Sequence, residues 1–264
     1  MRFPVTSMTA CLCASLASVA AAQSRPSAPA SPPFGHELSI TTGMGFTDRI
    51  DASASPRPYG GLANGVGLSY TFRPGAWTLT TRAQGSIASL QPRDDFAGSE
   101  HAYAGGLAFD AQRTVAQFGP VTMRAGLTLE SWADALRHRY GDQSSTTSTF
   151  ISAFGTAGPA VSLSMPLGGG TLSGLASIPL GGLVYQPYAN ARQEREPIRL
   201  TTAGPTSLRG LDFGLRYESS ASRTFGIVAE YRFRGFDYTG GWHARSITNT
   251  TSIGIVTRFG RKGQ

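Results

Sequence analysis

Residues suited to acid–base chemistry are few and scattered in this 264-residue sequence. Histidine is the side chain that most readily exchanges a proton near neutral pH. There are four, His36, His101, His138 and His243. Asp94 and Asp95 form an adjacent acidic pair, and the spacing of His243 and Ser246 suits a base and a nucleophile. Pairs of this kind also arise by chance among solvated loop residues, so alone they predict no catalytic residue.

Motifs for metals, cofactors or thiol chemistry are also missing from the sequence. Its His, Asp and Glu residues do not cluster at the spacing of metal ligands. The run from Gly168 to Gly170 precedes no helical pattern, so it predicts a turn and not a phosphate-binding loop. Cys11 and Cys13 both lie near the N-terminus. We therefore expect no metal and no cofactor.

The first 35 residues have the composition of an export segment and a linker. Arg2 precedes a run of small apolar residues from Cys11 to Ala22, which ends in a small-x-small cleavage pattern. This architecture predicts a signal peptide over 1–22. Residues 23–35 are rich in Pro, Ala and Ser and predict a flexible lead-in. No apolar run reaches the roughly 18 residues of a spanning helix. We therefore expect either a soluble secreted protein or a membrane barrel.

Beyond the lead-in, apolar and polar residues alternate with a period of two, which is the signature of half-buried β-strands. Prolines make two of the segments less regular, at Pro159 and Pro179, because proline cannot donate a ladder hydrogen bond. A count of about ten strands follows. The expected strands span 36–46, 60–72, 77–90, 103–118, 121–132, 152–165, 171–185, 211–217, 225–233 and 251–259.

The connections between these segments alternate in length. Links after the even-numbered segments are short, at 73–76, 119–120, 167–170 and 219–223. Links after the odd-numbered segments are longer and polar, at 47–59, 91–101, 133–149, 186–206 and 236–246. Transmembrane barrels show this pattern, with brief periplasmic turns and extended external loops. The sequence therefore predicts an all-β fold over 36–260, a closed antiparallel up-and-down transmembrane barrel with both termini periplasmic, followed by a short basic tail over 261–264.

A soluble barrel would have the same alternation with its two faces exchanged. Aromatic residues decide between these orientations, because a membrane-interface girdle places them at the strand ends. Six lie beside the short turns, namely Phe72, Trp77, Phe118, Tyr217, Phe225 and Phe259. This favours an apolar face toward lipid and a polar face toward the lumen. A secreted soluble binder remains the alternative.

The polar face carries the charged residues of the candidate site. A barrel of about ten strands has an interior little wider than its side chains fill. Mixed charges there favour a salt-bridged plug, whereas an excess of arginine favours a narrow anion-preferring channel. For the channel, Arg232, Arg234 and Arg258 are the expected selective residues. The candidate lumen residues are Arg82, Asp110, Arg124, Glu130, Asp212, Arg216, Glu230, Arg232, Arg234 and Arg258.

The last expected strand adds a motif. Its pattern of Ser252, Gly254, Thr257 and Phe259 resembles the C-terminal assembly signal of bacterial outer-membrane β-barrels. Thr257 stands where that signal has a hydrophobic residue, and five residues follow the aromatic. The resemblance implies an outer-membrane location, with the barrel-assembly machinery and outer-membrane lipid as partners.

The ten-strand architecture also resembles the omptin proteases, which carry an Asp pair and an Asp–His pair on opposing loops. Asp94 and Asp95 match the first pair loosely, but the link over 186–206 contains neither Asp nor His. The resemblance therefore lacks half of the catalytic set, and we expect no enzyme. An outer-membrane hydrolase that uses His101, His138 or His243 remains a lesser alternative.

The charge of the chain indicates which partners to expect. The net charge is +7, and Lys262 is the only lysine among 23 basic residues. No basic run is interleaved with aromatics, which argues against a nucleic-acid partner. Arginines in two long links could bind lipopolysaccharide phosphates, namely Arg137, Arg139, Arg192, Arg195 and Arg199. We predict a structural or surface-interaction barrel; the sequence leaves its ligand and oligomeric state open.

Overall fold

The structure is a computed structural model that describes residues 34–52, 55–94, 98–140, 147–186, 199–219, 222, 224–240 and 243–261. The expected signal peptide and most of the lead-in lie outside these residues. The described part belongs to one compact unit, Pro32–Gln264. It is built from strands, and no helix in it is long and apolar enough to span a bilayer.

Twelve strand segments follow one another in the part of the chain that the structure describes. The first six are long: β1 Phe34–Asp51, β2 Ser55–Phe72, β3 Trp77–Pro92, β4 Gly98–Phe118, β5 Val121–Tyr140 and β6 Thr147–Leu167. The next four are shorter: β7 Gly170–Ser177, β8 Gly181–Gln186, β9 Arg199–Ala203 and β10 Leu208–Ser219. The last two are β11 Phe225–Tyr238 and β12 Ala244–Arg261.

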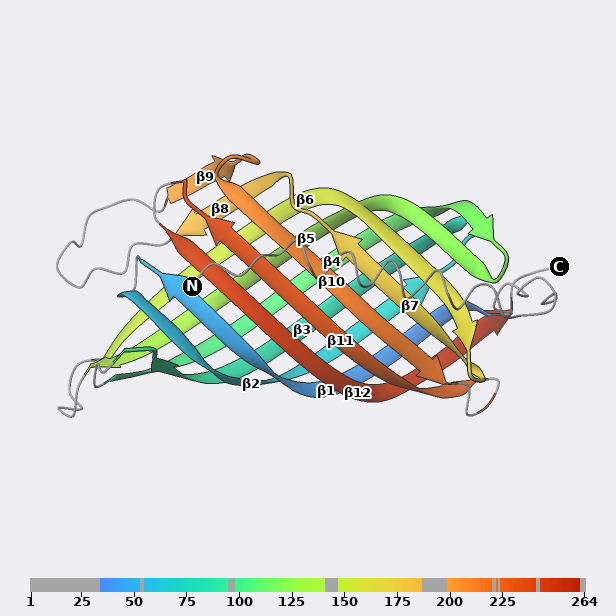
Figure 1. The fold of residues 1–264 in the computed structure, drawn as a ribbon, viewed down its shortest axis with the longest axis horizontal. Coiled ribbons are helices and arrows are strands. Elements are labelled where there is room, and N and C mark those ends of the chain that lie inside the picture. The colour runs from blue at the N-terminus through green and yellow to red at the C-terminus, as the bar shows by residue number, and fades with distance from the viewer. Residues whose placement is uncertain are drawn as a thin grey trace. The chain divides into compact units, whose positions relative to one another are not determined.

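These segments close into a barrel with ten wall positions. Neighbours along the chain pair antiparallel except β7 with β8 and β9 with β10, and β12 pairs with β1 to close the wall. Figure 1 shows the red β12 beside the blue β1. β7 and β8 share one position along β6, and β9 and β10 share the next. The predicted closed up-and-down barrel of about ten strands is confirmed.

The two faces of the wall differ as the alternation predicts. Outward side chains are apolar and exposed, with exposed fractions of 69% for Leu62, 64% for Val66 and 63% for Leu127. Inward side chains such as Ser39 and Asp110 are buried. An exposed apolar surface of this extent is unusual for a soluble protein. A closed barrel pairs its backbone groups between strands, which is what hydrocarbon surroundings demand.

The strands continue well into segments that the sequence predicts as long loops. β1 runs to Asp51, β5 to Tyr140, and β12 already begins at Ala244. The expected loop boundaries at this end of the barrel are therefore wrong. Polar residues such as Thr47 and Arg49 resemble loop residues in the sequence, yet they continue the inward-facing row of β1 and are buried.

Prolines affect two neighbouring wall positions differently. Pro179 separates β7 from β8, as its missing N–H group predicts. Pro159 lies within an uninterrupted β6, opposite Leu127 of β5. The irregularity expected at Pro159 is absent: β6 is continuous there, and the Pro159 carbonyl accepts a hydrogen bond from the backbone N–H of Ile178 at 3.2 Å. A second break, over 204–207, separates β9 from β10.

Candidate functional site

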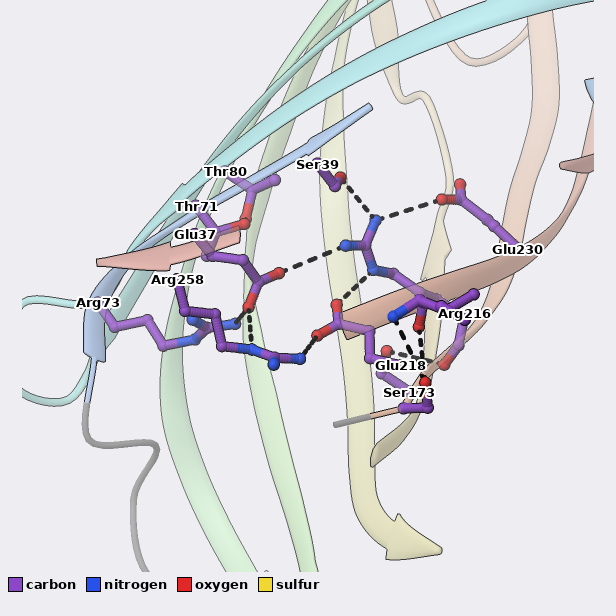
Figure 2. Close-up of polar contacts among 12 residues, drawn as sticks. Glu37, Ser39, Thr71, Arg73, Thr80, Ser173, Arg216, Glu218, Glu230 and Arg258 are labelled. Atoms are coloured by element: carbon purple, nitrogen blue, oxygen red, sulfur yellow. Dashed lines mark hydrogen bonds and ion pairs between the residues drawn. The ribbon is translucent and has the colours of Figure 1, made fainter. Parts of the chain in front are cut away.

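The lumen near the short turns contains a network of ion pairs around Arg216 of β10 (Figure 2). Its Nε lies 2.6 Å from Glu218 Oε1. Its two Nη atoms reach Glu37 of β1 at 3.4 Å and Glu230 of β11 at 3.5 Å. One guanidinium thereby connects three strands, and its planar fork of donors suits several carboxylates at once.

Glu37 connects this network to two further arginines. Arg73, in the β2–β3 turn, lies 3.2 Å from Glu37, and Arg258 of β12 lies 3.8 Å from it. Arg258 also approaches Glu218 at 3.1 Å (Figure 2). The sequence reading did not include Glu37 or Arg73. Glu37 could have been found, because it lies two residues before Ser39 on the same face of its strand.

A second network crosses the middle of the lumen from β11. Arg232 is paired with Asp212 of β10, and it also reaches Glu130 of β5 at 3.3 Å. It donates a hydrogen bond to Gln84 Oε1 of β3 at 2.8 Å. Arg234 is paired with Glu130. These side chains therefore bridge opposite sides of the barrel.

The remaining predicted lumen residues form smaller contacts. Arg82 lies 2.9 Å from Asp110, which also accepts a hydrogen bond from Thr128. Arg124 donates to Ser164 Oγ at 3.0 Å. All ten candidate charges thus face the lumen, and the structure joins most of them into the two networks.

Toward the long-loop end, the lumen contains a buried cluster that the sequence reading missed. Arg49 of β1 approaches Glu100 at 3.6 Å and Asp134 at 3.4 Å. His138 Nε2 lies 3.2 Å from the other oxygen of Glu100. The sequence predicts His138 in the external link over 133–149, where it would be exposed, and this prediction is wrong because His138 is only 1% exposed. These residues were missed because their segments were interpreted as loops, although each alternates inward.

Apolar side chains surround that cluster and fill the same end of the lumen. Trp132 stacks on Phe154 with ring centroids 5.2 Å apart, and Phe236 lies 5.0 Å from Phe154. This aromatic cluster comprises Trp132, Phe154, Val184, Ala203, Leu208, Phe236, Tyr238 and Ala244. A second cluster comprises Tyr59, Ala63, Ala88, Leu90, Ala102 and Leu136, with Phe150 packed against it.

Between the ionic networks and the aromatic cluster lies a chamber of about 180 Å³. Glycines and hydroxyls of β1, β2, β3 and β12 line one part of it, among them Ser39, Thr41 and Thr250. Arg232, Arg234, Trp132 and Phe236 are among its other lining residues. The small side chains on β1–β3 and β12 leave space that the larger side chains do not fill.

The rim residues considered for catalysis are dispersed. His101 is exposed on β4, 3.4 Å from Ser89. His243 lies 2.9 Å from Asp237, whereas Ser246 lines the chamber. Asp94 is paired with Arg57, and Asp95 lies outside the described residues. Within the described ranges, no three His, Cys, Asp or Glu side chains gather to hold a metal.

The residues of the C-terminal motif occupy both faces of β12. Ser252 lines the chamber, and Phe259 is 45% exposed on the outside. A Cβ on Gly254 would clash with the backbone of β1 at Ile40 and Thr41. Phe259 also stacks on His36, at a centroid distance of 5.4 Å. The role of the motif in assembly stays a prediction.

Comparison with known proteins places the fold. No protein-family model matches the sequence, and no curated protein matches it. Among solved structures, the chain is similar to the outer membrane protease OmpT of Escherichia coli, with a TM-score of 0.56 and 8% identity, over 86% of this chain and 97% of OmpT. The chain has the fold of bacterial outer-membrane β-barrels. At this identity, the likeness concerns the fold alone.

The translocator domain of the autotransporter NalP from Neisseria meningitidis is also similar. Its TM-score is 0.48 at 9% identity, over 96% of both chains.

Proposed function

We propose that this protein is an integral barrel of the bacterial outer membrane that is closed to ions along its axis and has a structural or surface-interaction role. This proposal rests on Arg232 of β11. Its side chain crosses the lumen and contacts Gln84 of β3 and Glu130 of β5. An ion on the axis would have to displace buried charges that are paired with one another, which is costly away from bulk water.

The same contacts favour a plug over an anion channel. A selective channel presents unneutralised charge to the permeating ion. Here Arg232 and Arg234 are both paired with Asp212 and Glu130, and Arg258 is paired with Glu218 and Glu37. The arginines expected to select anions are therefore neutralised by carboxylates of neighbouring strands.

We also propose that the barrel is not an enzyme. Asp94 is paired with Arg57, and His243 pairs with Asp237 on the opposite side of the same connection. The fold likeness to a protease does not supply the missing residues.

The exterior offers a second role, the binding of phosphate groups of outer-leaflet lipid. On the outside of the barrel, His101 of β4 is the direct partner of Arg137 of β5, and Arg139 lies two residues further along the same face. The described parts of β4, β5 and β6 carry no carboxylate on this exterior face. Exposed arginines without a nearby acid suit bidentate contacts to phosphate.

Planar-bilayer conductance tests the closed axis. The folded protein is first verified by its heat-dependent gel mobility, and we then expect no steady current. A double change, Arg232→Gln with Asp212→Asn, removes both charges of one pair and should introduce a leak. The exterior change Arg137→Ala is the matched control and should stay silent. Stable unitary currents from the unchanged protein would refute the closed axis.

A further inference from the structure

Among the described residues of the barrel wall, one sector between adjacent strands lacks ladder pairing. β7 pairs with β10 up to Ser177 and Asp212, and β8 pairs with β9 from Gly182 and Ala203 onward. Between these points, residues 178–181 lie on one side and 204–211 on the other, and no ladder pair joins them. We call this stretch the seam. All of its backbone belongs to the described residues.

Each side of the seam is hydrogen-bonded to the strand behind it. Ile178 N–H donates to Pro159 O at 3.2 Å, and Leu180 N–H donates to Ala157 O at 2.9 Å, both on β6. On the other side, Leu208 to Gly210 pair with β11. The two edges are therefore held by different neighbours, β6 and β11, and these bonds stay intact when the seam widens. Widening strains only the flanking pairs, Ser177 with Asp212 and Gly182 with Ala203.

Across the seam, the edges meet through a side chain. A Cβ on Gly210 would lie 2.8 Å from Pro179 Cγ, so the proline ring packs closely against the glycine. Pro179 has no backbone N–H to offer to β10. The contact is therefore a van der Waals one, and such contacts are individually weak compared with the ladder bonds that they replace here.

The outside of the seam is apolar. Ile178, Leu180 and Leu211 have exposed fractions of 50%, 52% and 43%. Leu183 and Leu200, just beyond the seam, are also exposed, at 51% and 63%. The seam therefore lies within the apolar band of the wall, at the level of the hydrocarbon.

A small cavity of about 20 Å³ leads inward from the seam. Ile178, Pro179 and Leu211 line it on the wall side. Trp132, Arg234 and Phe236 line it and also line the chamber of about 180 Å³. These three side chains are the partition between the seam and the chamber. Arg234 holds its guanidinium 5.5 Å from the centre of the Trp132 ring.

We propose that the seam is a lateral entrance through which a small molecule passes from the bilayer into the chamber. The entrance opens when the partition side chains change rotamers and the edges at Pro179 and Gly210 separate. The route does not run along the barrel axis, but one partition residue, Arg234, also belongs to the ionic network that crosses the lumen.

The chamber defines the class of ligand. An apolar cavity of about 150 Å³ in another protein holds one benzene, so by size about 180 Å³ fits a single ring with a substituent. Unlike that cavity, this chamber is also lined by charged side chains, among them Arg82, Arg216 and Glu230, so the substituent must be polar. Trp132 and Phe236 offer ring contacts, and Ser39, Thr41 and Thr250 offer hydroxyls. The fitting ligand is a bilayer-soluble monocyclic molecule with one neutral polar group, of the size of a phenol.

Quenching of Trp132 fluorescence by 4-bromophenol tests binding. The other tryptophans are replaced (Trp77→Phe, Trp242→Phe), and the full chain is folded into lipid vesicles and checked by heat-dependent gel mobility. Because Trp132 is buried beside the chamber, we expect quenching that saturates with the concentration of 4-bromophenol. Quenching that rises linearly without saturation, as in the bilayer alone, would overturn the chamber as a binding site.

Two disulfides across the ends of the seam test the route. The facing pairs are Leu183 with Thr202 and Ala176 with Phe213, each replaced by Cys. Facing residues of an antiparallel pair have Cα atoms about 4.5–5.5 Å apart, within disulfide range. Cys11 and Cys13 are changed to Ser. The matched control joins Ile40 and Leu68, which face each other across the intact β1–β2 ladder.

Oxidation of the two seam disulfides should slow quenching of Trp132 by about tenfold or more, and reduction should restore it. Oxidation of the control disulfide should leave the rate unchanged. If the seam disulfides leave the rate unchanged, the ligand enters along the axis and the lateral entrance is refuted. If the barrel conducts ions but oxidation of the seam disulfides still slows quenching, only the proposal of a closed axis is refuted. The two proposals can therefore be refuted independently.

Discussion

The two ends of the lumen are filled by different physical means. At the short-turn end and in the middle, charged side chains such as Arg216, Arg232 and Glu37 pair across the barrel. Toward the long-loop end, rings such as Trp132, Phe154 and Tyr238 pack against one another, and the buried charges described there belong to the cluster around Arg49. Charges require a partner at a defined position, whereas apolar rings tolerate several packings of similar volume. The ionic end should therefore be the less tolerant of single changes.

The largest expected effect is at the ionic end. Glu130→Ala removes a carboxylate shared by Arg232 and Arg234 and leaves buried positive charge without its partner. Breaking a buried pair in this way costs about 3–5 kcal/mol of unfolding free energy. Urea unfolding of the barrel in lipid vesicles measures the loss. Ser131→Ala, on the adjacent exposed position, is the matched control, and equal stability of the two variants would contradict the prediction.

A smaller effect is expected at the aromatic end. Phe154→Leu keeps an apolar side chain of similar volume against Trp132 and Phe236, and it should cost less than about 1.5 kcal/mol. Ile151→Leu, on the exposed face of the same strand, should change the unfolding free energy still less. If Phe154→Leu lowers the unfolding free energy as much as Glu130→Ala does, the aromatic cluster depends on one arrangement of side chains as strongly as the ionic network, and the prediction is contradicted.

The smallest effect on stability is expected outside the lumen. The double change Arg137→Ala with Arg139→Ala alters exposed positions and should shift the unfolding free energy by less than about 0.5 kcal/mol per residue. It should nevertheless weaken binding to vesicles that contain phosphate-bearing lipid. Arg113→Ala, an exposed arginine near the opposite end of β4, is the control. Unchanged lipid binding in the double variant would refute the phosphate-binding role.

The faces of the strands could be predicted because each residue's side follows from a period of two, which needs no knowledge of partners. Arg232 and Leu127 therefore lie inside and outside as expected. Strand ends were less predictable. At Arg49 and His138 the inward face becomes charged, and polar residues at a strand end read as loop residues in a sequence.

Of the two breaks in the wall, one could be predicted from the sequence and the other could not. Pro179 signals its own interruption, since a missing N–H is visible in the sequence. The neighbouring break over 204–207 was hidden because β9 lies in a segment interpreted as loop. The seam arises only where the two breaks face each other, and that juxtaposition is a property of the closed wall.

The sequence by itself determined the alternation, the polarity of each face and the number of wall positions, because these depend on neighbours along the chain. Only the tertiary structure decided which charges meet. Arg232 and Glu130 are 102 residues apart and lie on strands that are not adjacent in the wall. Their contact depends on the stagger and diameter of the closed barrel, which together set the strands that face each other across the lumen.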